Sequence, residues 1–92
     1  MILSFKCPDT EALANGNWVR RFAGIESSAR RKLRQLQIAR QLQDLRVPPG
    51  NRLESLKGHR KGQYSIRVND QFRVCFRWTL PGAEDVEIVD YH

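Results

Sequence analysis

The sequence has little of what marks a membrane-spanning, exported or disulfide-stabilised protein. No apolar run in its 92 residues approaches the roughly 18 residues of a spanning helix. The amino terminus carries Lys6 and Pro8 where a signal peptide needs an uninterrupted apolar stretch. The only two cysteines, Cys7 and Cys75, have no further cysteine or histidine at ligand spacing, so we expect no metal and no cofactor. These absences predict a cytoplasmic protein with reduced thiols and no membrane partner.

Acidic residues are also scarce relative to basic ones. Sixteen Lys and Arg residues stand against ten Asp and Glu, a formal net charge of +6, and twelve of the sixteen are Arg. The cations concentrate in residues 20–46 and 52–77, whereas residues 80–92 carry four acids and no cation. Because Arg is a planar, permanently charged fork that binds phosphates, this balance favours a polyanionic partner, above all nucleic acid. The alternative is a basic protein whose charge serves solubility alone.

The first quarter of the chain predicts short elements. Residues 1–6 predict a strand, which the following proline ends. Residues 9–15 predict a short helix with Asp9 as its N-cap and Gly16 beyond its end. Residues 17–26 show weak periodicity, and we expect an ordered loop there.

Residues 27–46 are rich in good helix formers and predict the main helix, with Ser27 or Ser28 as its N-cap. The apolar residues change side along it at about 100° per residue: Ala29, Leu33 and Leu36 share one side, and Ile38, Leu42 and Leu45 fall almost opposite. A straight helix would leave one triplet exposed. We therefore expect a break near residues 37–40 and a second short helix that ends before Pro48.

After residue 50 the apolar period switches to two. Strands are predicted at residues 62–68, 71–78 and 84–90, with a further short strand within 51–56. Asn69-Asp70 joins the first two of these strands, because both residues tolerate the positive φ of a tight hairpin turn. The whole order predicts an α+β fold, in which two to three amino-terminal helices pack on a small antiparallel sheet. The length allows one domain, which we assign to residues 1–92.

Strand alternation assigns each residue to one side of the predicted sheet. The core side holds Tyr64, Ile66, Val68, Phe72, Val74, Phe76, Trp78, Val86 and Ile88. The opposite side holds Gln63, Ser65, Arg67, Gln71, Arg73, Cys75, Arg77, Glu87, Val89 and Tyr91. Small residues at Ser65 and Cys75 leave room above the sheet, so this side predicts a cationic platform for a phosphate backbone. The alternative is an ordinary solvated surface with Arg67 and Arg73 paired to Glu87.

The sequence closes on Asp90-Tyr91-His92. Carboxylate, phenol and imidazole side chains serve general acid–base catalysis, and histidine titrates near neutrality. A terminal triplet can equally be frayed and inert.

Three stretches carry a family resemblance. They are Leu56-Lys57-Gly58-His59-Arg60-Lys61-Gly62-Gln63-Tyr64-Ser65-Ile66-Arg67-Val68, then Asn69-Asp70-Gln71-Phe72-Arg73-Val74, and the final Asp90-Tyr91-His92. Through them the chain resembles the HigB branch of the RelE/ParE toxin superfamily, and the likeness spans essentially the whole sequence. The resemblance implies a type II toxin: a ribosome-dependent messenger-RNA endonuclease that inhibits translation and that a cognate helix-turn-helix antitoxin (HigA-like) holds inactive.

The resemblance also implies a site around the scissile phosphate. The matching residues are Lys57, Arg67, Arg73, Asp90, Tyr91 and His92. Some relatives have a histidine where this chain has Glu54, which leaves the general base open between Glu54 and His92. RNA supplies its own nucleophile, the 2′-hydroxyl, so a base, charge stabilisation by Arg73 and a proton donor (Tyr91 or His92) would suffice without a metal.

Basic side chains around this site are expected to bind the RNA; they are Lys57, Arg60, Lys61, Arg67 and Arg77. His59 lies on the turn before the strand and is either a phosphate contact or a solvated loop residue. Two other functions stay open: a gyrase-directed inhibitor of the same fold without nuclease activity, and a non-catalytic nucleic-acid-binding module. The latter needs exposed aromatic residues for stacking, and Tyr91 is the only candidate.

Overall fold

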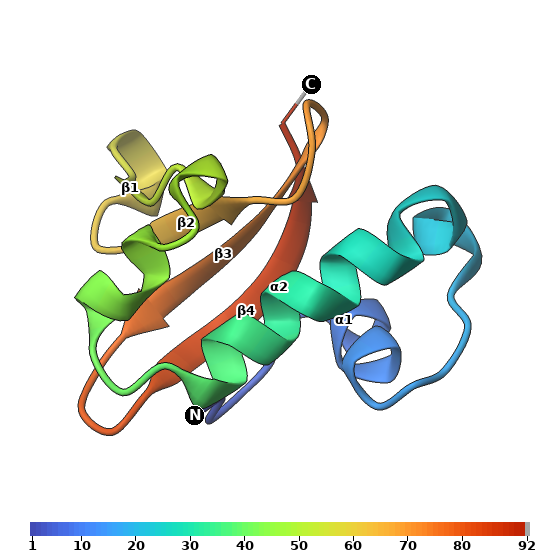
Figure 1. The fold of residues 1–92 in the computed structure, drawn as a ribbon, viewed down its shortest axis with the longest axis horizontal. Helices are drawn as coiled ribbons and strands as arrows, with labels where there is room; N and C mark the ends of the chain where they lie inside the picture. The colour runs from blue at the N-terminus through green and yellow to red at the C-terminus, as the bar shows by residue number, and fades with distance from the viewer. Residues whose placement is uncertain (92) are drawn as a thin grey trace.

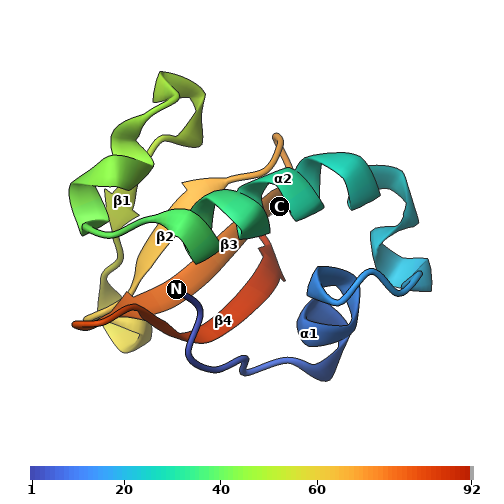
Figure 2. The ribbon, with the colours of Figure 1, turned by 60° about the horizontal axis from the view of Figure 1, so that its bottom comes forward.

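Four antiparallel strands and two α-helices make up the fold in the computed structural model, which describes residues 1–91. The strands are β1 (Glu54–Ser55), β2 (Tyr64–Arg67), β3 (Phe72–Trp78) and β4 (Ala83–Asp90), in the sheet order β1-β2-β3-β4. The helices α1 (Pro8–Ala14) and α2 (Glu26–Ile38) lie on one side of this sheet (Figures 1 and 2). The predicted α+β fold and its antiparallel meander are confirmed.

The main helix breaks where the apolar residues change side. Its inner stripe of Ala29, Leu33 and Leu36 is buried, and the helix ends at Ile38 because Ala39 has an extended backbone (ψ 134°). A 3-10 helix follows at Leu42–Arg46, and the Asp44 carboxylate accepts hydrogen bonds from the backbone N–H of Arg40 and Gln41, both at 3.0 Å. The predicted break and second short helix are therefore confirmed. Of the second apolar triplet, Leu45 is buried and Ile38 is exposed.

Both predicted N-caps were wrong. α1 begins one residue earlier than predicted, with Cys7 at the N-cap position, because Pro8 at the first helical position has no N–H to satisfy and a φ already suited to the helix. α2 begins at Glu26, since the 3-10 helix Arg20–Ile25 leads directly into it. That 3-10 helix occupies the segment predicted as a loop and buries Phe22 and Ile25. Gly16, with φ +91°, does follow the end of α1 as predicted.

The first six residues form no regular strand, contrary to the prediction. They run parallel to β4 in two isolated bridges, Ile2 to Ala83 and Phe5 to Val86. Ala83 N–H donates to the Met1 carbonyl at 2.8 Å, and this approach leaves no space for a side chain at Gly82, whose Cβ would stand 2.1 Å from that oxygen. The chain start is thus attached to the edge of the sheet.

The turn between β2 and β3 differs from the predicted one. Asn69 and Asp70 do not adopt a positive φ. Instead the Asn69 side-chain oxygen accepts hydrogen bonds from the backbone N–H of Gln71 (2.8 Å) and Phe72 (2.7 Å), which closes the turn as an Asx motif. Among the described non-glycine residues, a positive φ occurs at Arg52 (45°) and at Asp85 (54°), which lies in β4 beside the register shift of the β3–β4 pair.

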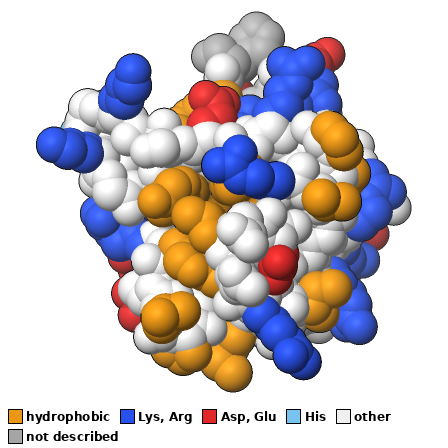
Figure 3. Space-filling view, turned by 60° about the vertical axis from the view of Figure 1, so that its left-hand side comes forward, with side chains coloured by type: hydrophobic (Ala, Val, Ile, Leu, Met, Phe, Trp, Pro, Cys, Tyr) orange, Lys and Arg blue, Asp and Glu red, His pale blue; other side chains and the backbone are white. Residues whose placement is uncertain are grey.

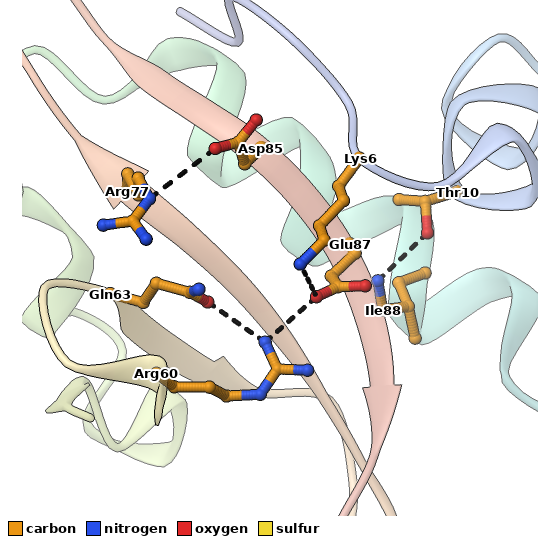
Figure 4. A network of polar contacts seen from close by, with 8 residues as sticks. All are labelled: Lys6, Thr10, Arg60, Gln63, Arg77, Asp85, Glu87 and Ile88. Atoms are coloured by element: carbon orange, nitrogen blue, oxygen red, sulfur yellow. Dashed lines mark hydrogen bonds and ion pairs between the residues drawn. The ribbon is translucent and has the colours of Figure 1, made fainter. Parts of the chain in front are cut away.

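The core lies between the helices and the sheet. Its strand residues Ile66, Val68, Val74, Phe76, Val86 and Ile88 are buried, with Tyr64, Phe72 and Trp78 packed around them. The predicted core side is therefore confirmed. Thr10 of α1 accepts a hydrogen bond from the backbone N–H of Ile88 at 3.0 Å, which attaches α1 to β4 (Figure 4). The other side of the sheet, named the outer face here, bears the polar residues.

Candidate active site on the outer face of the sheet

Arg73 lies at the centre of the outer face and is held rigidly. It stands in β3 opposite Arg67 on one neighbour and Val89 on the other. Only 8% of the residue is exposed. Its Nε donates to the Ser65 hydroxyl and its Nη2 to the Arg52 carbonyl, each at 2.7 Å. The guanidinium therefore has a fixed position and orientation.

Glu54 and Tyr91 flank this guanidinium. A carboxylate oxygen of Glu54, in β1, lies 3.0 Å from Arg73 Nη2. The Tyr91 ring centre lies 6.0 Å from Arg73 Cζ, within range of a cation–π contact. The backbone N–H of Tyr91 donates to the Gln71 carbonyl at 2.7 Å, which continues the β3–β4 pairing by one residue. Three of the predicted site residues, from three separate segments, are thus brought together.

The Tyr91 hydroxyl is protonated near neutrality. Partial burial raises the pKa of Tyr91, and the neighbouring Cys75 adds to the rise, whereas Arg60 and Arg73 act in the opposite direction. The phenol is therefore protonated near neutrality, which is the state a general acid needs, and the raised pKa makes it a weaker acid than a solvated tyrosine. Cys75 is itself fully buried, and burial raises the pKa of its thiol.

The outer face has no free space above Ser65 and Cys75, contrary to the prediction that these small residues leave room above the sheet. Both residues are completely buried. Arg60 extends toward this part of the face, where its Nη1 donates to the side chains of Gln63 (3.1 Å) and Glu87 (3.0 Å). Figure 4 shows this network, with Lys6 on the far side of Glu87 at 3.9 Å.

Every arginine predicted on the outer face has an acidic partner. Glu87 pairs with Arg60. The pairs of Glu87 with Arg67 and Arg73 that belonged to the solvated-surface alternative are absent among the described residues. Arg67 pairs with Asp70 in the β2–β3 turn. Arg77 Nε lies 3.6 Å from Asp85, as Figure 4 also shows.

The predicted RNA-binding lysines lie apart from this paired set. Lys57 and Lys61 flank the short 3-10 helix Gly58–Arg60, and both are exposed. His59, on the same 3-10 helix, is also exposed. This turn is the basic, accessible part of the predicted RNA-binding set.

The closing triplet divides between the two sides of the sheet. Asp90 pairs in register with Phe72 and accepts a hydrogen bond from the Gln71 amide at 3.0 Å. By alternation along β4, Asp90 leaves the strand on the side of Ile88, opposite to Tyr91. His92 lies outside the described residues.

Two contacts of Arg73 were not predicted from the sequence. The Arg52 carbonyl accepts from Arg73 because Arg52 has a left-handed backbone (φ 45°), for which a non-glycine residue gives no sequence signal. The contact with the Ser65 hydroxyl could have been predicted. Ser65 was placed on the correct side of the sheet, and its register partner Cys75 is two residues from Arg73 along β3. The predicted strand register therefore already places Ser65 near Arg73.

Residues 1–91 contain neither a candidate metal site nor a candidate membrane-spanning helix. No group of three or more His, Cys, Asp or Glu side chains could hold a metal ion there. In the same residues, no helix is both long enough and apolar enough to cross a membrane.

Comparison with known proteins defines the class. A family model described as RelE-like toxin of type II toxin-antitoxin system HigB matches residues 17–92. The chain therefore belongs to the HigB-like toxins of the RelE superfamily, as the resemblance predicted.

Individual relatives agree with this assignment. The chain is 52% identical to a protein named Toxin HigB-1 from Vibrio cholerae over 56 residues, which cover 61% of this chain and 59% of the relative. It is 42% identical to an uncharacterised protein of Haemophilus influenzae over 48 residues, 52% of this chain and 48% of the relative. The chain thus matches only about half to three fifths of each relative's length.

A solved structure agrees in fold. The YoeB-YefM complex from Staphylococcus aureus aligns with a TM-score of 0.57 over 100% of this chain and 98% of that chain. The identity is 18%, so this likeness supports the fold alone.

Proposed function

We propose that residues 1–92 act as one toxin domain that cleaves messenger RNA on translating ribosomes in the cytoplasm. A cognate helix-turn-helix antitoxin would hold it inactive. The observation that carries the proposal is the group of Glu54, Arg73 and Tyr91, in which a fixed guanidinium lies between a carboxylate and a protonated phenol. These are the three functions that RNA cleavage by its own 2′-hydroxyl requires.

The proposed reaction is a transfer of the phosphoryl group within the RNA. The 2′-oxygen forms a bond to phosphorus while the bond from phosphorus to the 5′-oxygen breaks. A base, Glu54 or His92, takes the proton of the 2′-hydroxyl, and Tyr91 or His92 gives a proton to the leaving 5′-oxygen. The products are a 2′,3′-cyclic phosphate, which can open to a 3′-phosphate, and a 5′-hydroxyl.

Glu54 has a second part in this scheme. At rest its carboxylate offsets the charge of Arg73 at 3.0 Å, and its side chain is 54% exposed. A phosphate that approaches Arg73 competes for the same guanidinium, so Glu54 turns away and its carboxylate becomes available for the 2′-hydroxyl. Arg73 then stabilises the charge that develops on the phosphate oxygens.

The ion-paired arginines of the outer face support dependence on the ribosome. A face whose arginines are already ion-paired has little capacity to orient a flexible RNA, and a ribosome that holds the message reduces the orientation cost. Membership of a toxin–antitoxin family supports the proposal that a cognate antitoxin binds this chain.

Tyr91→Phe is the sharpest test of this proposal. The change removes one hydroxyl at an exposed position, so folding should be unaffected, while cleavage should fall at least about 10²-fold, as expected for loss of a general acid. The assay is cleavage of a reporter message in a reconstituted translation reaction, with the 5′ ends mapped.

Tyr64→Phe is the matched control. Tyr64 stacks on Phe76, on the opposite side of the sheet, so the same chemical change there should leave cleavage unaltered. Wild-type cleavage by Tyr91→Phe would remove Tyr91 as the donor. A wild-type chain that cuts no message with or without ribosomes would refute the nuclease proposal, and inhibition of gyrase would then support the alternative within the same fold.

A further inference from the structure

The backbone carbonyl of Arg52 holds the guanidinium of Arg73, and Arg52 has an unfavourable backbone conformation. Arg73 Nη2 donates to this carbonyl at 2.7 Å. Arg52 lies in the left-handed region (φ 45°, ψ 57°), and the residue is exposed. A residue other than glycine keeps such a conformation only where the surrounding structure fixes it. The segments around Arg52 must therefore hold its carbonyl in place.

Asn51, directly before that residue, is completely buried, and its side chain is bonded to two other segments. Its Nδ2 donates to the carbonyls of Leu45 (3.1 Å) and Val47 (3.4 Å), at the end of the 3-10 helix that follows α2. The same Nδ2 donates to the Gln35 side-chain oxygen at 2.9 Å, and Asn51 Oδ1 accepts from Lys32 Nζ; both of these partners belong to α2. One side chain thus attaches this turn to the helical layer.

The turn connects this attachment to the candidate active site. Asn51 ends the 3-10 helix Pro49–Asn51. The backbone N–H of Arg52 donates to the Pro49 carbonyl at 3.1 Å, so Asn51 and Arg52 belong to one hydrogen-bonded turn. The Arg52 carbonyl then accepts from Arg73 at the centre of the outer face. Hydrogen bonds therefore connect α2 to the proposed catalytic guanidinium through the Asn51 side chain and the Arg52 backbone.

Asn51 does not itself contact an RNA, because no part of it reaches the surface. The surface near the turn has a hollow whose lining includes Leu42, Leu53 and Tyr64. Figure 3 shows that side as an apolar area with separate basic side chains around it. Any effect of Asn51 on cleavage therefore acts through Arg73.

We infer that Asn51 is a positioning residue: its side-chain amide fixes the turn whose next carbonyl sets the orientation of the Arg73 guanidinium. Without that carbonyl, Nη2 would keep only its longer contacts with Glu54 (3.0 Å) and the Ser65 carbonyl (3.4 Å). The effect on cleavage rests on the proposed function, in which Arg73 stabilises the charge that develops on the phosphate. Such stabilisation needs a donor that is oriented before the reaction, and a displacement of about 1 Å can lower the rate about 10²-fold.

The first measurement follows the guanidinium itself and needs no nuclease activity. Exchange spectroscopy by carbon and nitrogen NMR gives the rate at which the Arg73 guanidinium rotates about its Nε–Cζ bond. In Asn51→Ala this rotation should be about tenfold faster or more, as expected when a charged group loses one hydrogen bond. Arg60, which Gln63 and Glu87 hold, is the internal reference in the same spectrum, and its rotation should not change.

The second measurement is the cleavage of a ribosome-bound message. Asn51→Ala should lower kcat about 10²-fold and leave KM close to the wild-type value, because Asn51 does not touch the message. A role in stability alone would lower activity only in proportion to the unfolded fraction. Circular dichroism at the assay temperature gives that fraction.

Two further variants separate positioning from stability. Leu13→Ala removes a completely buried side chain from α1, which packs on α2 and β4, so it should destabilise the fold as strongly without touching the turn. In folded Leu13→Ala, both the rotation rate and kcat should stay at the wild-type values. Asn51→Asp keeps the oxygen that accepts from Lys32 but removes the amide hydrogens, so it should behave as Asn51→Ala does. It carries the test if the alanine variant does not fold.

The inference is overturned if the Arg73 guanidinium rotates at the wild-type rate in the folded Asn51 variants. It is also overturned if Arg60 loosens equally, or if Leu13→Ala loosens Arg73 to the same extent. Faster rotation with a wild-type kcat would overturn it as well, because the orientation of the guanidinium would then not matter for cleavage. A wild-type chain that cuts no message would count against the proposed function instead, and the rotation rates would still show whether Asn51 fixes Arg73.

Discussion

Replacement of Arg73 by alanine should destabilise the protein as well as affect its activity. Arg73 is almost completely buried on the outer face, where a solvated arginine would be dispensable for folding. Its Nε and Nη2 donate short hydrogen bonds to the Ser65 hydroxyl and the Arg52 carbonyl. Alanine removes both donors and leaves the buried Ser65 hydroxyl without this partner.

The expected cost follows from these contacts. A hydrogen bond from a charged group contributes about 1.5–3 kcal/mol, and the two bonds share one guanidinium, so their loss is less than additive. The ion pair with Glu54 adds at most about 0.5 kcal/mol, because that carboxylate is more than half exposed. The free energy of unfolding should therefore fall by about 3–4 kcal/mol, a large part of the 5–15 kcal/mol or so typical of a small domain.

Urea unfolding of Arg73→Ala measures this cost, with Arg77→Ala as the control. Arg77 stands four residues away on the same face of β3, but its side chain is 44% exposed and its one ion pair is 3.6 Å long. Arg77→Ala should cost no more than about 0.5–1 kcal/mol, with similar m values for both variants. A loss below about 1 kcal/mol for Arg73→Ala, or equal losses for both, would refute the structural role. Because of that role, lost activity in Arg73→Ala alone would not assign it to catalysis.

Three further results are expected. Asn51→Ala should lower the free energy of unfolding by about 2–4 kcal/mol in thermal or urea unfolding, because the buried Lys32 ammonium loses the Asn51 side-chain oxygen as its acceptor. A loss under about 1 kcal/mol would contradict this. Iodoacetamide should label only Cys7 in the native protein, because Cys75 is fully buried and its thiol pKa is raised. In denaturant it should label both cysteines, and mass spectrometry counts the labels. Rapid labelling of Cys75 in the native protein would be inconsistent with the structure. Asp85→Gly should be more stable than Asp85→Ala by about 1 kcal/mol, because Asp85 has a positive φ, which glycine adopts more easily than alanine. Equal melting temperatures of the two variants would show that the backbone at this position is unstrained.

The fold was largely predictable because its main signals are local. A period of two along β3 gave both its strand and its buried side, and the sheet packs as that alternation requires. The break after Ile38 was predictable too, because one straight helix cannot bury apolar residues on two opposite sides. The first six residues were not, because their parallel bridges to β4 depend on a segment more than 75 residues away.

The structure brings together three of the predicted site residues, Glu54, Arg73 and Tyr91, whereas Lys57 and Asp90 lie apart from them. Alternation put Arg73 and Tyr91 on the outer face, and Glu54 entered as the residue that stands where some relatives have a histidine. Neither kind of reasoning says which carboxylate pairs with which arginine. A pair of Glu87 with Arg73 belonged only to the alternative of a solvated surface; Arg60 pairs with that carboxylate instead, from 27 residues away in the sequence. Such a pair is set by the course of the Gly58–Arg60 turn, which local sequence does not determine.

That pairing changes how the charge of the protein should be interpreted. Sequence alone gathers the arginines of the strands into a cationic platform, yet a buried or half-buried guanidinium needs an anion beside it, and the fold supplies one to each. Arg31 and Arg34 of α2 are exposed, and neither has a carboxylate within 4 Å among the described residues. The fold therefore separates its arginines by burial: Arg60 and Arg73 are paired with carboxylates on the outer face, and Arg30 of α2 is paired with Glu26, whereas Arg31 and Arg34 are exposed. Net charge therefore favours an anionic partner, but only the arginines that no carboxylate offsets are left to attract it.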